Sequence, residues 1–232
     1  MIIPAGGRIV FLVAVVLFAA AGAFYYRRHL LIRDEARRLQ QENFATAVGK
    51  YDVYHTTQAD IVMLGTSLTA NAEWAELLGR KDVVNRGVGS DITSGFLSRI
   101  GYILRLHPKI CFIEGGVNDV FNGIEPNEIF SSIMKIIDTL KEAGITPVIQ
   151  TAPFAAPPIQ DASAINGKLR ALNDRLRAYA DSSAAEFIDL NALLASNEQL
   201  NPGLTPDGLH LNGRGYAIWG EAVEAILARH KL

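Results

Sequence analysis

The sequence has a single cysteine and no excess of basic charge, and both scarcities exclude classes of function. One cysteine, Cys111, leaves no second thiol for a disulfide framework or a cysteine metal site. Because it stands in a short apolar run, we expect a small buried core residue. The formal net charge of -2 provides no basic field for nucleic acid. We therefore predict neither a disulfide nor a nucleic-acid partner.

Residues 9–26 contain no charged side chain, and a helix of that length matches the hydrocarbon core of a bilayer. They predict a single membrane-spanning segment. Ala21 to Ala23 has the small-x-small form of a signal-peptidase site, which would release a secreted or periplasmic protein. Tyr25 and Tyr26, followed at once by two arginines, favour a retained anchor instead. The side of the membrane on which the rest of the chain lies stays open.

The remaining chain is expected to form two further parts. Residues 1–28 would be the anchor, and residues 29–50 a charged stalk helix that ends near Gly49, because glycine commonly terminates helices. Residues 51–232 would then form one globular domain.

Short apolar runs alternate with helical stretches through that domain. Strands are predicted at 61–64, 83–84, 110–113, 147–150 and 187–188, and helices near 70–78, 94–106, 126–143, 164–180 and 215–229. This β-α alternation indicates an α/β fold with a parallel sheet covered by helices on both faces. Ligands of such sheets bind beyond the carboxyl ends of the strands.

Small hydroxyl and amide residues follow the predicted strands. Ser67 comes directly after the first strand and before a helix, where a serine either caps the helix or presents its hydroxyl to a site. Asn118 follows the third strand after two glycines. Its side chain can donate to an oxyanion or form an Asx-turn.

Asp207 and His210 stand three residues apart in the last loop, directly before the C-terminal helix. An aspartate at this offset can accept from one imidazole nitrogen, which leaves the other nitrogen to act as a general base for a serine. A capping aspartate beside a surface histidine is the simpler alternative.

Together these residues resemble the SGNH hydrolases, also called GDSL esterases and lipases. Four blocks occur in the family's order: Gly65-Thr-Ser67, Val84 to Thr93, Gly116-Val-Asn-Asp119 and Asp207-Gly-Leu-His210. The resemblance implies a three-layer α/β/α flavodoxin-like fold and a catalytic triad of Ser67, Asp207 and His210. It also implies an oxyanion hole made by the Ser67 N–H, a block-two N–H and the Asn118 side chain.

Two blocks depart from the family pattern. Thr66 replaces the usual aspartate, which is not a triad member, so we expect changed hydrogen bonding without loss of activity. Ser90 stands where the family has a glycine donor. Its N–H can serve if its φ is allowed, and otherwise Gly89 or Gly87 would take that role.

The resemblance predicts a carboxylic ester hydrolase that cleaves small acyl esters, acetyl esters above all, on carbohydrate or lipid, without metal or cofactor. Three alternatives stay open: a lysophospholipase or lipase-like acyl hydrolase, an acyltransferase, and a catalytically silent carbohydrate-binding relative. A nucleotide or flavin binder is disfavoured because no phosphate-cradling glycine loop opens the first helix.

Overall fold

The computed structural model describes residues 5–232, with the side chains of 5–17, 19, 29–30, 32–33 and 36–37 outside the described part. The chain divides into two compact units, one ending at Glu42 and the other covering Asn43–Leu232. Helix α1 (Ala5–Val53) contributes to both.

Helix α1 continues through Gly49 and ends at Val53, so the predicted stop at Gly49 was wrong. Glycine inside a helix costs roughly 0.5–1 kcal/mol, which is small beside tertiary packing. Tyr51 is buried in the second unit, and Arg105 donates a hydrogen bond to its carbonyl oxygen. Tyr102 also donates to the Asp52 carboxylate, so contacts with the domain hold the last turn in helical form.

No helix in the part of the chain that the structure describes is both long and apolar enough to cross a membrane. The predicted span, residues 9–26, falls largely on side chains outside that part. Retention of the segment and cleavage after Ala23 both stay predictions.

Within the described residues, five parallel strands form one sheet in the order β2-β1-β3-β4-β5. They are β1 (Ile61–Gly65), β2 (Val83–Gly87), β3 (Ile110–Ile113), β4 (Thr146–Gln150) and β5 (Glu186–Ile188). The predicted parallel sheet is confirmed, and its strand order is that of flavodoxin-like folds. The central strands are buried on both faces, which explains their continuous apolar runs.

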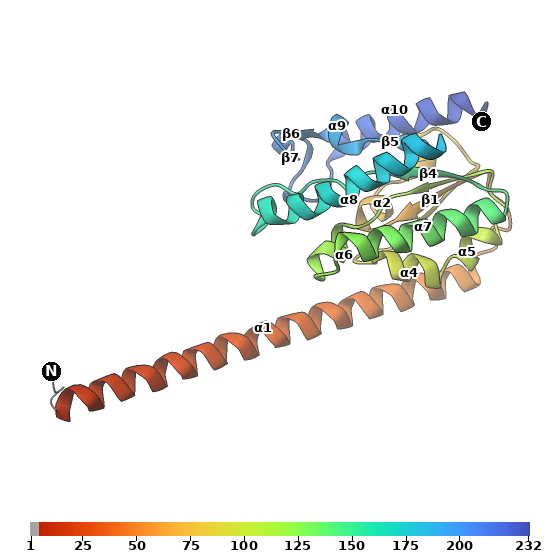
Figure 1. Cartoon of the computed structure of the whole chain (residues 1–232). Coiled ribbons are helices and arrows are strands. Elements are labelled where there is room, and N and C mark those ends of the chain that lie inside the picture. The colour runs from red at the N-terminus through yellow and green to blue at the C-terminus, as the bar shows by residue number, and fades with distance from the viewer. Residues whose placement is uncertain (1–4) are drawn as a thin grey trace. The chain divides into compact units, whose positions relative to one another are not determined.

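Helices cover both faces of the sheet, as expected, and Figure 1 shows this arrangement. The face that carries Val62 and Leu64 packs against α4 (Thr93–Ser98), α5 (Gly101–Leu104), α6 (Val117–Phe121), α7 (Pro126–Glu142) and α8 (Ala162–Ser183). The face that carries Ile61 and Met63 packs against α2 (Ser67–Ala70), α3 (Trp74–Leu77), α9 (Leu190–Leu194) and α10 (Gly213–Arg229). Cys111 is buried in the first of these layers, as predicted.

Two predicted helices are each divided in the structure. Of the stretch 70–78, only the first residue belongs to α2 and residues 74–77 form α3, while most of 94–106 is divided between α4 and α5. The second break falls at Arg99, whose side chain turns into the interior. The short strands β6 (Ala195–Ser196) and β7 (Gln199–Leu200) and the 3₁₀ turn η1 (Pro202–Leu204) precede the loop that carries Asp207 and His210.

Candidate active site

Ser67 is the first residue of α2, directly after β1. Thr66 caps this helix, because its hydroxyl accepts a hydrogen bond from the Leu68 N–H. A methyl group on Gly87 would lie 2.2 Å from the Ala70 nitrogen, so only glycine lets α2 pass so close to β2. The turn therefore places the Ser67 side chain at the carboxyl edge of the sheet.

Side chains from other elements hold this single turn of helix. Asn85 donates to the carbonyl oxygens of Thr69 and Ala72 at 3.0 and 2.9 Å. The Trp74 indole also donates to Thr69, and the Tyr216 hydroxyl donates to the Leu68 carbonyl. These donors satisfy carbonyls that a four-residue helix cannot satisfy itself.

Ser67, His210 and Asp207 form a hydrogen-bonded chain of side chains. The Ser67 Oγ lies 3.0 Å from the His210 Nε2, and the His210 Nδ1 lies 2.7 Å from the Asp207 Oδ2. Ser67 and His210 are separated by 143 residues in the sequence, and the fold brings them together. Both distances suit a serine whose proton passes to an imidazole that a carboxylate orients.

The Asp207 carboxylate is held in its charged form. Partial burial raises its pKa, but hydrogen bonds from the His210 ring and from the N–H groups of His210 and Leu209 outweigh burial and lower the pKa to about 2. Asp207 therefore carries a negative charge at neutral pH, which fixes the His210 Nδ1 as the protonated nitrogen of the neutral ring.

The loop of Asp207 and His210 rests on the backbone that follows β4. The Ala156 N–H donates to the Gly208 carbonyl oxygen at 2.8 Å. Gly208 has a φ of +86°, and a side chain there would meet the Ala156 carbonyl. Asn166 and Asn173, both buried on α8, each exchange two hydrogen bonds with this backbone, at Ala155 and Ala152 respectively. Neither asparagine was predicted to support this loop, because an isolated asparagine within a helix carries no motif that indicates such a role.

Asn118 lies at the start of α6, beside the block-two loop. Its Nδ2 donates to the Asp91 carbonyl oxygen at 2.9 Å, which uses one of its two protons and fixes the amide. The other proton stays available for a ligand. This contact joins blocks two and three across the end of β1, the strand that lies between β2 and β3 in the sheet.

The three candidate block-two donors differ in their backbone geometry. The Gly87 N–H donates to the Asn85 side chain at 2.8 Å, so the suggestion that it could replace Ser90 was wrong. Ser90 has a φ of +61°, in the left-handed region that glycine prefers. Among the described residues, neither the Ser90 nor the Gly89 N–H has a hydrogen-bond acceptor. Both can still donate to a substrate.

A family model described as GDSL-like lipase/acylhydrolase matches residues 56–218. The chain belongs to this family. This is a family of ester hydrolases of the SGNH type, and the resemblance drawn from the four blocks is confirmed.

Curated relatives are distant. The chain is 24% identical over 171 residues to the N-acylneuraminate cytidylyltransferase of Streptococcus agalactiae, a match that covers 74% of this chain and 39% of that protein. The chain thus spans about two fifths of that relative's length. It is 26% identical over 161 residues to thioesterase 1/protease 1/lysophospholipase L1 of Escherichia coli, covering 66% of this chain and 73% of the relative.

Solved structures share the fold. A GDSL-like lipase from Bacteroides thetaiotaomicron is 20% identical and superposes with a TM-score of 0.71, over 81% of this chain and 98% of that one. A carbohydrate acetylesterase from Sinorhizobium meliloti is 18% identical with a TM-score of 0.58, over 74% of this chain and 99% of that one.

Thr66, at the position of the aspartate in the GDSL name, donates to a buried carboxylate. Both its N–H and its hydroxyl donate to the Glu114 Oε2, at 3.1 and 2.9 Å, and the Thr69 hydroxyl donates to the same atom at 3.1 Å. Glu114 directly follows β3 and is fully buried. Its Oε1 has no hydrogen-bond partner in the part of the chain that the structure describes. Glu114 thus fixes the turn around Ser67 in this GDSL-type chain.

Arg99 ties the block-two loop to the sheet. It is 1% exposed, and its Nε donates to the Asp91 Oδ2 at 2.8 Å. Its other nitrogens donate to the carbonyl oxygens of Arg86 at 2.6 Å and Gly65 at 3.1 Å. A buried arginine at this position could not be predicted, because arginine is usually exposed.

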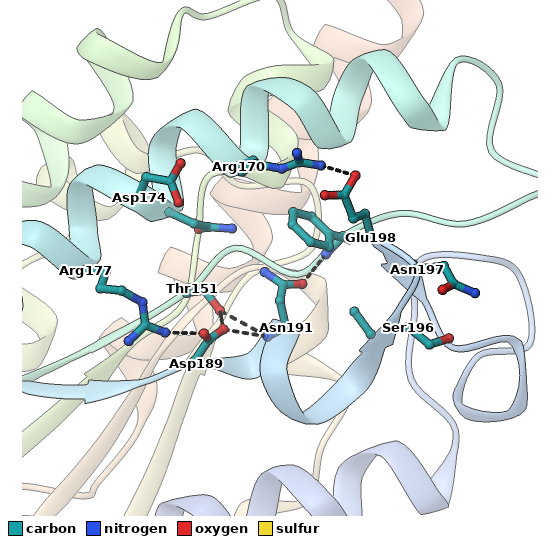
Figure 2. Close-up of a pocket in the computed structure, with 12 residues that line it drawn as sticks. Thr151, Arg170, Asp174, Arg177, Asp189, Asn191, Ser196, Asn197 and Glu198 are labelled. Atoms are coloured by element: carbon teal, nitrogen blue, oxygen red, sulfur yellow. Dashed lines mark hydrogen bonds and ion pairs between the residues drawn. The ribbon is translucent and has the colours of Figure 1, made fainter.

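A separate polar cavity of about 280 Å³ lies among residues that follow β4 and β5. Figure 2 shows that its charged groups face one another, with Arg177 directed at Asp189 and Arg170 at Glu198. Asp189 also caps α9 through the N–H groups of Asn191 and Ala192. Neither Ser67 nor His210 lines this cavity, and four of its charged side chains are already paired with one another.

Replacing Arg99 with methionine should lower the free energy of unfolding by about 3–5 kcal/mol, because the Asp91 carboxylate then stays buried without its partner. Urea denaturation of each variant gives the free energies. Arg80→Met removes a more exposed ion pair with Asp82 and should cost at most about 1 kcal/mol. Equal losses in the two variants would contradict the role assigned to Arg99.

Glu114 should make stability depend on pH. Burial raises its pKa in the folded state above the ordinary value of 4.5, despite three hydrogen bonds that lower it. As pH rises past 4.5, the unfolded chain loses this proton first, so stability falls until the folded pKa is reached. Glu114→Gln cannot lose a proton. The variant should therefore gain stability relative to the parent as pH rises from 4.5 towards neutrality.

Urea denaturation across that range measures the difference, and Glu128→Gln, at an exposed position of α7, is the matched control. A Glu114→Gln variant that loses stability relative to the parent at rising pH would show that Glu114 is charged in the folded protein.

Proposed function

We propose that this chain hydrolyses small acyl esters, in particular acetyl esters of carbohydrates, through an acyl-enzyme on Ser67. The observation that carries the proposal is the pair of contacts at His210, 3.0 Å to the Ser67 hydroxyl and 2.7 Å to Asp207. A histidine placed between a hydroxyl and a carboxylate at these distances is the arrangement that activates a serine nucleophile.

In the first step the Ser67 Oγ attacks the ester carbonyl while the His210 Nε2 accepts the hydroxyl proton. The tetrahedral intermediate collapses, and His210 returns that proton to the departing alcohol. In the second step His210 accepts a proton from water, which attacks the acyl-Ser67 carbonyl. The intermediate collapses with cleavage of the bond between the acyl carbon and the Ser67 Oγ, His210 returns the proton to that Oγ, and the carboxylic acid is released. Asp207 remains ionised throughout, consistent with its low pKa, and stabilises the imidazolium.

The oxyanion of each intermediate would be held by three donors. The Ser67 N–H is one, since its helix has no earlier carbonyl to which it could donate. The free proton of the Asn118 amide is the second, and the Ser90 N–H is the third. The left-handed φ of Ser90 explains why glycine is usual at this position, and it leaves the N–H able to donate. Loss of one such donor typically costs about 10²- to 10³-fold in turnover.

Two kinds of ester remain to be separated. The fold shared with the carbohydrate acetylesterase of Sinorhizobium meliloti supports acetyl groups on sugars. The relative from Escherichia coli bears the names thioesterase and lysophospholipase, which supports longer acyl chains. We favour the acetyl ester of a sugar because polar side chains, among them Lys50, Glu73 and Asn85, line a groove next to the block-two residues 87–89, where they suit hydroxyl groups better than an acyl chain.

The test is hydrolysis of p-nitrophenyl acetate and of its longer-chain analogues by the full-length chain in detergent. Ser67→Ala should abolish turnover, because no other hydroxyl lies against His210 within the described part of the chain. The free energy of unfolding should stay close to that of the parent.

Acetate should be the preferred acyl group in the parent protein. A preference for octanoate or longer chains would replace the acetylesterase proposal with a lipase-like activity. Full turnover in Ser67→Ala would remove the serine mechanism itself, whereas a well-folded parent without turnover would favour an acyltransferase or a binding protein.

A further inference from the structure

A groove of about 520 Å³ lies between the end of α1 and a wall that includes Ala70 and residues 87–89. Both of its walls belong to the compact unit that begins at Asn43. Because the established family chemistry does not use α1, the groove calls for a separate explanation.

One wall is a face of the last turns of α1. Asn43, Thr46 and Lys50 line it, and Tyr54 continues the same face just beyond the helix. Spacings of three and four residues place these side chains above one another on a helix. Each of the four is exposed, so they meet the groove with free polar groups.

The other wall is made by the segments that carry the proposed oxyanion donors. Ala70 is the last residue of α2, the helix that begins with Ser67. Gly87 ends β2, and Gly89 directly precedes Ser90. Gly89 thus places this wall one residue from the proposed donor Ser90, and Ala70 places it one helical turn from Ser67.

The α1 wall is fixed to the domain by its last turn. The Tyr51 ring lies 4.6 Å from the Arg86 guanidinium and 5.6 Å from the Tyr102 ring, and its hydroxyl donates to the Gly87 carbonyl. Arg105 donates to the Tyr51 carbonyl oxygen. The wall is thus held against the end of β2, the strand that leads into block two.

Arg86 also joins the end of α1 to the domain. Its guanidinium is buried, and two of its nitrogens have no hydrogen-bond partner among the described residues. The rings of Tyr51 and Tyr54, at 4.6 and 5.8 Å, cover it instead. Cation–π contacts of this kind compensate in part for the lost hydration of a guanidinium.

The chemistry of the walls selects a neutral, hydroxyl-rich ligand. Lys50 and Glu73 carry opposite charges, and neither has an ion-pair partner within the described part of the chain. Their charges cancel, which disfavours a phosphate or another anion. An acyl chain would strip water from both groups without replacing its hydrogen bonds. Sugar hydroxyls can both donate to Glu73 and accept from Lys50, and the exposed Tyr54 ring offers a surface for a pyranose face.

We infer that the α1 groove binds the sugar portion of the ester whose acetyl group is transferred to Ser67. This inference rests on the proposed function and names where its alcohol part lies. It also makes residues 43–54 part of the enzyme, although they belong to the helix that continues from the predicted anchor.

Thr46→Trp tests the inference, since a large ring at this exposed helical position fills the groove without entering the core. Ala45→Trp is the matched control, because Ala45 is exposed on the same helix and does not line the groove. The full-length chain in detergent is assayed with acetylated xylo-oligosaccharides and with p-nitrophenyl acetate. Thr46→Trp should lower kcat/KM for the oligosaccharide, relative to kcat/KM for p-nitrophenyl acetate, at least about tenfold. The change should come from a higher KM for the oligosaccharide. Ala45→Trp should leave the ratio of the two kcat/KM values unchanged.

A second measurement does not depend on turnover. Binding of the same oligosaccharides to Ser67→Ala, measured by calorimetry, should weaken at least about tenfold when Thr46→Trp is added. An unchanged ratio together with unchanged binding would overturn the groove assignment, as would an equal loss of activity on both substrates. If the parent does not hydrolyse p-nitrophenyl acetate, the proposed function fails, while the binding measurement still decides the groove.

Discussion

The Arg99 guanidinium holds together the segments on which the site is built. It donates to the carbonyl oxygen of Gly65, two residues before Ser67, to that of Arg86 in β2, and to the Asp91 carboxylate next to Ser90. The Asp91 carbonyl in turn accepts from Asn118. One buried cation thus sets the spacing of the loops that carry the nucleophile and two proposed oxyanion donors. It adds to the hydrogen bonds that the Val88 N–H and the Asn118 amide already make with the neighbouring segments.

A second constraint acts on the nucleophile itself. Because α2 is a single turn, it has little stability of its own. Its conformation depends on hydrogen bonds with residues distant in the sequence. Glu114 accepts from the Thr66 hydroxyl at the start of the helix, and the side chains of Asn85 and Tyr216 donate to the helix carbonyl oxygens. The same principle holds for His210, whose loop rests on the backbone that Asn166 and Asn173 hold. Accurate placement of Ser67 against His210 is therefore a property of the whole domain.

The sequence was informative where a local pattern has one physical meaning. Central parallel strands are buried on both faces, so the apolar runs of β1, β3 and β4 predicted them, and shorter apolar pairs marked the edge strands β2 and β5. The spacing of Asp207 and His210 likewise predicted their contact. The sequence was uninformative where a residue acts through its tertiary position. Arginine and glutamate are normally exposed, so the burial of Arg99 and Glu114 was not predicted. For Glu114 there was one usable signal, because a carboxylate directly after an apolar strand is unusual. The helix end at Val53 depends on distant contacts of Tyr51.

The central claim is that Ser67, activated by His210, forms a covalent acyl intermediate. Labelling with a fluorophosphonate, followed by intact-mass measurement and peptide mapping, tests it without any assumption about the natural ester. The account predicts one adduct per chain, located on Ser67, with labelling strongly slowed in His210→Ala. An adduct on another residue, or no adduct on a folded chain, would contradict it.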